Sequence, residues 1–194
     1  MRAVDRRELI VDAAMAVFGD YGYVGTTTDQ VARAAGVSQP YVVRMFGTKE
    51  KLFLEVLEKA LGTLLADFRA ALADSSEVPL YVRLGRAYFN LLSDRGLLLS
   101  LMHGFVLGSD PVIGARCRQG YLGVYQFLRE EAGFSPDQSH AFLANGMLIN
   151  TMVGLRMSDD FESNPLAHEL LVSAFPEKLD LLLELGKKNK PDGA

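Results

Sequence analysis

The chain has 194 residues, of which 49% are hydrophobic and 23% are charged, a composition that supports one large or two small globular domains with a real core. Its single cysteine, Cys117, excludes an intrachain disulfide and indicates a reducing compartment. The net charge of −4 does not by itself indicate a nucleic-acid-binding protein.

The charge is unevenly distributed along the chain. Residues 1–50 carry six basic and six acidic side chains, so the acidic excess lies in residues 51–194. A neutral N-terminal part can still bind DNA if its basic side chains share one face. Those side chains are Arg2, Arg6, Arg7, Arg33, Arg44 and Lys49.

The sequence shows no targeting or membrane-spanning segment. The N-terminal MRAVDRRELI is charged and lacks the apolar stretch of a signal peptide. The most apolar run, Gly96–Gly108, contains Ser100 and His103 and is too short to span a bilayer. We therefore expect a soluble, cytoplasmic protein with no membrane partner.

The first predicted helix runs from about Arg6 to Tyr21. Asp5 is a suitable N-cap, and Glu8 stands three residues on, as in a capping box. Gly22 is expected to end the helix. An apolar stripe at helical spacing gives this helix a buried side, and it consists of Leu9, Ile10, Ala13, Ala14, Val17 and Phe18.

A short second helix is predicted to follow Thr27. Thr27 can cap it, and Gln30 stands where a capping box places Glu or Gln. Gly36 supplies the left-handed conformation that ends a helix, and Val37 follows as an apolar plug. The apolar residues of this helix are Val31, Ala32 and Ala35.

A third helix is predicted from Ser38, which is a suitable N-cap, to Gly47, which ends it. Pro40 falls in the first turn, where a missing N–H costs little, and Thr48 can cap the helix that comes next. The inner side of the third helix is expected to consist of Val42, Val43, Met45 and Phe46.

Two short helices joined by a tight turn with a glycine form the helix-turn-helix pattern, whose second helix enters the major groove of DNA. Polar or amphipathic residues lie at the start of the second helix, where base edges are read, and they are Ser38, Gln39, Tyr41 and Arg44. An ordinary helical hairpin with a solvated face is the alternative interpretation.

The run AGVSQPYVVRMFGTKEKLF resembles the DNA-binding domain of the TetR family of transcriptional regulators. The positions that match the family pattern are Ala35, Gly36, Val37, Ser38, Phe46, Lys49 and Leu52. The resemblance implies an N-terminal three-helix helix-turn-helix domain in residues 1–50. A long helix would join it to a C-terminal ligand-binding and dimerisation domain in residues 51–194.

Two residues depart from the family pattern. Pro40 replaces a glycine, and Val43 replaces a tyrosine that contacts a phosphate in the family; Tyr41 is expected to take over that contact. We expect Gln39 and Tyr41 to contact base edges and Lys49 to contact a phosphate. The full predicted DNA-binding set is Thr27, Thr28, Ser38, Gln39, Pro40, Tyr41, Arg44 and Lys49.

The rest of the chain is predicted to be helical, so the expected fold is all-α. An unbroken apolar pattern from Thr48 to Leu72 predicts one long helix. The tail Lys187–Pro191 looks disordered. Further helices are expected at about Leu80–Ser93, Leu97–Leu107, Pro111–Ala132, Pro136–Met157 and Pro165–Leu185, between Gly, Ser and Pro signals.

Aromatic and adaptable side chains in this second part predict a mainly apolar ligand pocket with a few polar groups. His103 is a lone polar side chain in an apolar run, and its alternative role is that of a satisfied core histidine. The predicted ligand-binding residues are Met102, His103, Phe105, Tyr121, Tyr125 and Asn150.

The last two long predicted helices carry apolar residues on more than one side, which favours an intermolecular bundle. In the family that this chain resembles, the two C-terminal helices form the homodimer interface. The alternative is a helix pair buried in the core of one chain.

The sequence lacks the patterns of an enzyme. It has no Gly-x-Ser-x-Gly motif and no metal-ligand spacing among its three scattered histidines, His103, His140 and His168. We expect no cofactor and no metal. The function that the resemblance implies is a homodimeric repressor that binds a near-palindromic operator and is released by a small ligand. A helical ligand- or partner-binding protein with little specific DNA binding is the alternative.

Overall fold

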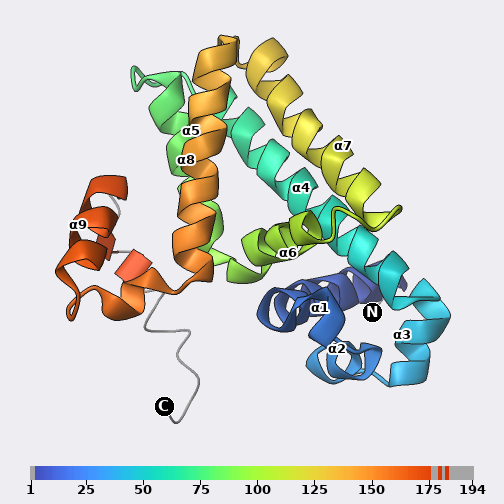
Figure 1. The fold of residues 1–194 in the computed structure, drawn as a ribbon. Helices are drawn as coiled ribbons and strands as arrows, with labels where there is room; N and C mark the ends of the chain where they lie inside the picture. The colour runs from blue at the N-terminus through green and yellow to red at the C-terminus, as the bar shows by residue number, and fades with distance from the viewer. Residues whose placement is uncertain (1–2, 176–178, 181, 184–194) are drawn as a thin grey trace. The chain divides into compact units, whose positions relative to one another are not determined.

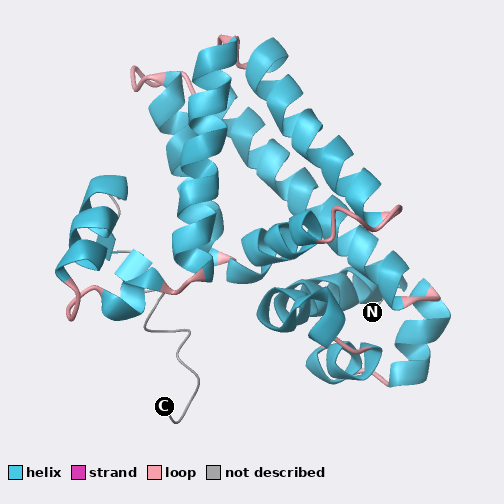
Figure 2. Cartoon of the chain, viewed as in Figure 1, coloured by secondary structure: helices cyan, strands magenta, loops and turns pink. Residues whose placement is uncertain are grey.

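The computed structural model describes residues 3–175, 179–180 and 182–183. Nearly all of them are helical and none lies in a β-strand, which confirms the all-α prediction (Figure 2). The chain divides into two compact units, Met1–Ser139 and His140–Ala194.

Seven helices make up most of the first unit (Figure 1), and they are α1 (Ala3–Gly25), α2 (Thr28–Ala34), α3 (Gln39–Phe46), α4 (Lys49–Ala73), α5 (Leu80–Asn90), α6 (Arg95–Val106) and α7 (Ile113–Gln126). A 3₁₀ turn, Leu91–Ser93, follows α5, and a π-helical turn, Phe127–Glu131, follows α7. Helix α8 (Pro136–Gly154) begins in the first unit and continues into the second. That unit also holds a 3₁₀ turn, Met157–Asp160, and α9 (Pro165–Ala174).

Helix α1 is longer than the predicted one. It begins at Ala3, so Asp5 lies inside its first turn and the prediction that Asp5 caps it is wrong. An acidic side chain in the first turn still favours the helix through the helix dipole. Gly22 breaks the regular helix with φ 70° and ψ 173°, as expected, and one more short turn leads to Gly25.

The ends of α2 form as the sequence predicts. The Thr27 hydroxyl accepts a bond from the backbone N–H of Gln30 at 3.2 Å, and the Thr27 N–H donates to the Gln30 side chain at 2.8 Å. Gly36 has φ 65°, and the N–H of Val37 donates to the Ala32 carbonyl at 2.9 Å, which closes the helix in a Schellman arrangement. Ser38 occupies the N-cap of α3, but its side chain makes no capping hydrogen bond.

The Thr27 cap gives a direct stability prediction. Thr27→Ala removes the acceptor for the Gln30 N–H and should destabilise the protein by about 1 kcal/mol, or roughly 2–4 °C in Tm. Thr63→Ala inside α4 is the matched control, because it makes the same chemical change where no cap is lost. Equal thermal unfolding midpoints for the two variants would contradict the capping role.

The inner side of α3 differs from the prediction at one position. Val42 and Phe46, one helical turn apart, are buried, but Val43 is 39% exposed. Residue 43 lies about 100° around the helix from residue 42, so it leaves the buried side. The residue that replaces the family's phosphate-contacting tyrosine therefore lies on the outer face of α3.

Three aromatic rings hold the N-terminal helices to the start of α4. The Phe18 and Phe53 ring centroids lie 4.7 Å apart, and those of Tyr23 and Phe53 lie 5.0 Å apart. Both phenylalanines are fully buried. Tilted pairs at these distances add attraction beyond the burial of apolar area.

Helix α6 packs closely against α1 (Figure 1). A Cβ added at Gly19 would lie 2.7 Å from the Gly96 Cα, so both positions require glycine. The buried Ser100 hydroxyl donates to the Met15 carbonyl of α1 at 3.1 Å. The N-terminal helices are therefore tied to α6 as well as to α4.

Helix α4 is the single long helix that the sequence predicts. Its N-terminal part packs on α1 and α3, and it also contacts α5, α6 and α7 (Figure 1). One side of it is buried over its length, through Leu52, Phe53, Val56, Leu57, Ala60, Leu64 and Phe68. The helix thus connects the helix-turn-helix to the helices that follow.

The last two helices are shorter than predicted. Helix α8 ends at Gly154, before Arg156 takes a left-handed conformation with φ 54°. Helix α9 ends at Ala174, and Phe175 has φ −128° and ψ 57°. Phe175 precedes a proline in the sequence, and proline disfavours the helical conformation of the residue before it. The predicted Lys187–Pro191 tail lies outside the described residues.

Candidate nucleic-acid interface

A basic cluster surrounds Tyr41 on α3. The Arg44 guanidinium lies 5.2 Å from the centroid of the Tyr41 ring, and the Arg6 guanidinium of α1 lies 5.6 Å from it. Neither arginine makes an ion pair with a described residue, and Arg44 is exposed. The aromatic ring holds two cations at the surface of the helix-turn-helix, where they can bind an anion.

Two other arginines of the N-terminal part are paired with acidic residues. Arg33 forms an ion pair with Asp29 at 3.0 Å along α2. Arg7 donates from Nε to a Glu55 carboxylate oxygen at 3.0 Å and lies over the Phe46 ring. Of the basic residues of this part, Arg6 and Arg44 therefore lie together beside Tyr41 without an ion pair to a described residue, and Arg2 lies outside the described residues.

The remaining predicted contacts lie at the same surface. The Gln39 side-chain amide donates to the Thr28 hydroxyl at 3.1 Å, which fixes α3 to the start of α2. Thr27, Ser38 and Pro40 are exposed. The structure therefore brings together the N-terminal ends of α2 and α3, where unpaired backbone N–H groups favour phosphate.

Lys49 is held inside the domain. Its ammonium group donates to the Tyr23 carbonyl at 2.8 Å and to the Thr26 carbonyl at 2.9 Å. It also lies 4.6 Å from the centroid of the Tyr23 ring. Burial raises the pKa of Tyr23, and the nearby carboxylates of Glu50 and Asp110 add to the effect. Lys49 thus joins the start of α4 to the α1–α2 junction, and a phosphate contact from its third N–H stays a prediction.

This arrangement predicts a structural effect of Lys49. Lys49→Met keeps the aliphatic stem but leaves the two carbonyls without their donor, so it should destabilise the protein by about 1–3 kcal/mol. The measurement is the midpoint of urea unfolding, with exposed Lys51→Met as the control. A loss of DNA affinity with unchanged stability would instead assign Lys49 to phosphate alone.

The predicted ligand residues lie in several places. Phe105 of α6 and Tyr121 of α7 meet edge to face, with centroids 5.8 Å apart. The His103 Nε2 lies 3.3 Å from the Gly19 carbonyl, and its ring lies beside Gly22, so His103 contacts α1. Asn150 lies in the second unit, with its amide nitrogen 4.0 Å from the Met147 sulfur.

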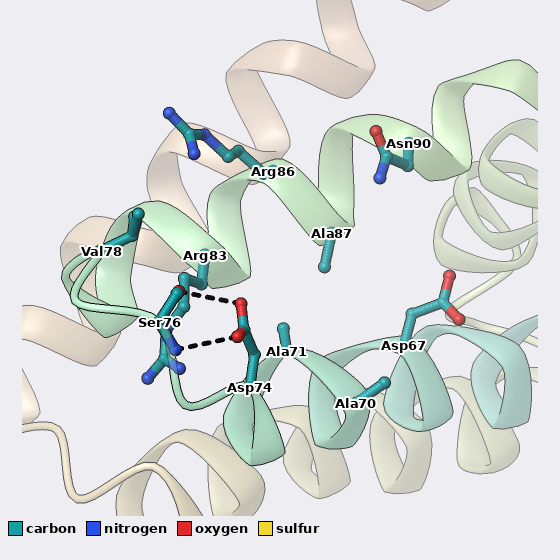
Figure 3. Close-up of a pocket in the computed structure, with 10 residues that line it drawn as sticks. All are labelled: Asp67, Ala70, Ala71, Asp74, Ser76, Val78, Arg83, Arg86, Ala87 and Asn90. Atoms are coloured by element: carbon teal, nitrogen blue, oxygen red, sulfur yellow. Dashed lines mark hydrogen bonds between the residues drawn. The ribbon is translucent and has the colours of Figure 1, made fainter.

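A groove of about 350 Å³ lies between α4 and α5, as Figure 3 shows, and none of the six predicted ligand residues lines it. Its walls carry both charged and small side chains, among them Asp67, Ala71, Arg83 and Ala87. The sequence prediction missed it because no local pattern connects these residues. Among the residues that the structure describes, no group of three or more His, Cys, Asp or Glu side chains could hold a metal ion, and no helix could cross a membrane.

Comparisons with known proteins agree with the helix-turn-helix geometry. The sequence model described as bacterial regulatory proteins, tetR family, matches residues 10–56. The HTH-type transcriptional regulator BetI of Rhizobium meliloti (strain 1021) is 42% identical over 67 residues, which cover 34% of this chain and 33% of BetI. The regulator RutR of Escherichia coli (strain K12) is 36% identical over 87 residues, 43% of this chain and 41% of RutR.

The chain thus spans between a third and a half of the length of these two relatives. The whole fold has a counterpart in the crystal structure of a TetR-like transcriptional regulator from Rhodococcus sp. RHA1, with a TM-score of 0.65, 18% identity and 97% of both chains covered. The matched proteins are transcriptional regulators and not enzymes. Residues 10–56 of this chain thus match the DNA-binding part of the TetR family of bacterial regulatory proteins, and the fold of the chain is that of a TetR-like regulator.

Proposed function

We propose that this protein is a cytoplasmic, ligand-responsive transcriptional repressor that binds a near-palindromic operator as a homodimer. Residues 1–50 would bind DNA, and residues 51–194 would bind the ligand and the second protomer. The observation that carries the proposal is the half-buried Tyr41 between Arg6 and Arg44, on a helix-turn-helix that matches the TetR family model. An arginine on a recognition helix suits both a guanine edge and a phosphate.

In this proposal the start of α3 lies in the major groove. Ser38, Gln39, Pro40 and Tyr41 would approach base edges, and Arg44 would contact a base or a phosphate. Thr27 and Thr28, at the N-terminus of α2, would position the DNA backbone together with Lys49. The exposed Val43 side chain cannot form a hydrogen bond, so neighbouring residues on the outer face of α3 would make the polar contacts with DNA.

Dimerisation is proposed through the second unit. Large apolar side chains are exposed on its two helices, including Leu148 at 43%, Leu166 at 75% and Leu170 at 37%. Burying such residues against a second copy would be favourable, and a two-fold axis makes the interface self-complementary. The two recognition helices would then meet half-sites about 34–36 Å apart, or a multiple of that distance.

A ligand would act by favouring one of two spacings of the recognition helices. It must bind the two states with different affinities, because equal binding shifts no equilibrium. Two helices can carry the change to the DNA-binding domain. One is α4, through Lys49, and the other is α6, through the Gly19–Gly96 crossing and the bond from Ser100.

The test is selection of bound duplexes from a random DNA pool by the purified full-length protein. We expect enrichment of a near-palindrome whose halves are centred one or more helical turns apart, and weaker enrichment with Arg44→Ala. Failure of the folded wild-type protein to enrich any sequence at low salt would favour a ligand- or partner-binding protein without specific DNA binding.

A further inference from the structure

The groove between α4 and α5 has charged ends and a floor of small residues. Figure 3 shows Asp74, Ser76 and Arg83 at one end and Asp67 at the other, with the methyl groups of alanines between them. Asp74, the C-cap residue of α4, follows Asp67 by about two helical turns, a rise of about 10 Å. The groove therefore has the length of a small extended molecule rather than of a single ion.

Arg83 is the first unusual feature of this groove. Its Nε and Nη1 atoms are buried and have no hydrogen-bond partner among the described residues. A buried donor left without an acceptor destabilises the fold, and a buried charge does so more strongly. A buried guanidinium usually has a carboxylate or another acceptor within hydrogen-bond distance. The missing acceptor at Arg83 points to a group that comes from outside the chain.

Asp74 does not supply that acceptor. Its two carboxylate oxygens accept hydrogen bonds from the Ser76 N–H at 2.9 Å and from the Ser76 hydroxyl at 3.0 Å (Figure 3). These bonds lower the pKa of Asp74, with a smaller contribution from Arg83, so the carboxylate stays ionised. Asp74 therefore offsets part of the Arg83 charge at a distance but leaves the guanidinium donors unpaired.

Asp67 is the second unusual feature. It is half-buried on α4 and forms no hydrogen bond or ion pair with a described residue. Its carboxylate lines the groove at the end away from Arg83 (Figure 3). An unpaired acid and an unpaired base thus stand at opposite ends of one groove.

We propose that this groove binds a small dipolar molecule, with its anionic group at Arg83 and its cationic group at Asp67. An acyl chain or other slim linker would lie over Ala70, Ala71 and Ala87, whose short side chains leave room for it. The guanidinium turns about its side-chain bonds to bring its free donors to the ligand carboxylate. The binding site does not depend on the proposed function. A role of this molecule as the effector would rest on that function.

The proposal is tested with three probes of one length. They are 6-aminohexanoate, which carries both charges at its ends, hexanoate, which carries the anion alone, and hexylamine, which carries the cation alone. Binding to the full-length protein is measured by calorimetry and by nuclear magnetic resonance. We expect 6-aminohexanoate to bind at least about tenfold more tightly than either single-charge probe, because it satisfies both ends.

Variants test which end of the groove binds which charged group of the probe. Arg83→Gln should weaken 6-aminohexanoate and hexanoate by about tenfold or more and leave hexylamine unchanged. Asp67→Asn should weaken 6-aminohexanoate and hexylamine and leave hexanoate unchanged. Arg33→Gln is the control, since it removes the same charge from an exposed side chain of α2 that does not line the groove. Equal losses in Arg83→Gln and Arg33→Gln, or no binding of any probe to the wild type, would overturn the proposal.

A stability measurement gives an independent readout. Arg83→Met removes an unpaired buried cation and keeps an apolar stem, so without a probe it should raise Tm by about 2–4 °C. Such a gain is the mark of a residue kept for binding rather than for folding. A fall in Tm of the same size would show that Arg83 has a structural partner.

The same probes separate this proposal from the proposed function. Operator affinity is measured with and without 6-aminohexanoate on the duplex recovered by selection. If 6-aminohexanoate binds in an Arg83-dependent way but operator affinity does not change, the groove is a binding site for dipolar molecules but is not the effector site. Operator binding without any probe binding would reject the site and keep the regulator.

Discussion

Gly19→Ala should lower the free energy of unfolding by about 2–3 kcal/mol, the upper part of the range for overpacking. Alanine normally stabilises a helix interior relative to glycine by about 1 kcal/mol, so the expected sign is opposite to helix propensity. The cause is the crossing of α1 and α6, where the new Cβ would lie 2.7 Å from the Gly96 Cα and 3.2 Å from the Gly96 carbonyl oxygen. Backbone atoms cannot turn aside as a flexible side chain can.

Gly62→Ala is the matched control for that prediction. Gly62 lies inside α4, and a Cβ added there meets no atom within 4 Å. It should therefore gain roughly 0.5–1 kcal/mol from helix propensity. Denaturant unfolding of both variants measures the difference, and Gly19→Ala as stable as Gly62→Ala would contradict the close packing of α6 on α1.

The double variant Arg6→Ala/Arg44→Ala should bind the operator about 100-fold more weakly or worse. The slope of log affinity against log salt concentration should also become smaller, by up to about 2. Each cation that binds a phosphate contributes roughly 0.9 to that slope. Loss of a contact to a base edge instead costs about 1–3 kcal/mol of binding free energy and relaxes specificity at one position. The salt series thus separates the two roles for Arg44.

Arg33→Ala is the control for the charge itself. Arg33 is also exposed but forms an ion pair with Asp29 on the same helix. We expect it to change affinity by less than about threefold, since an exposed pair of this kind contributes little. Anisotropy titrations on one labelled duplex compare the variants. Equal losses for Arg33→Ala and Arg44→Ala would mean that general charge, and not the cluster around Tyr41, binds the DNA.

Features set by neighbouring residues could be predicted from the sequence. The Thr27–Gln30 capping box, the left-handed Gly36 and the Thr48 cap of α4 depend on side chains within a few positions, and they formed as expected, whereas Ser38 occupies the N-cap of α3 without a side-chain hydrogen bond. The assignment of Val43 to the inner side was wrong because the third helix is short, and one buried stripe of Val42 and Phe46 is enough for it.

Features that join distant segments could not be predicted in this way. The Gly19–Gly96 crossing joins residues that are far apart in the sequence, and nothing in either local pattern indicates the partner. The sequence left His103 open between a pocket residue and a satisfied core histidine, and only the structure shows that its ring lies beside the kink at Gly22. The groove depends on the spacing of α4 and α5, so its unpaired Arg83 appears as an ordinary surface charge in the sequence.

The groove also changes the expected ligand. The sequence favoured a mainly apolar molecule because it offered aromatic side chains such as Phe105 and Tyr121 on neighbouring helices. In the structure these two rings pack on each other. The described cavity instead offers a guanidinium and a carboxylate, which select a charged molecule. A search for the effector should therefore include dipolar compounds from the start.

The most direct test of the central proposal is methylation interference on the selected operator. The N7 atom of guanine lies in the major groove, so its methylation blocks a helix that reads that groove. We expect interference at two groups of guanines related by two-fold symmetry, about 10 base pairs or a multiple apart. A single group, or none at any guanine while the protein still binds, would contradict a dimer that reads DNA through α3.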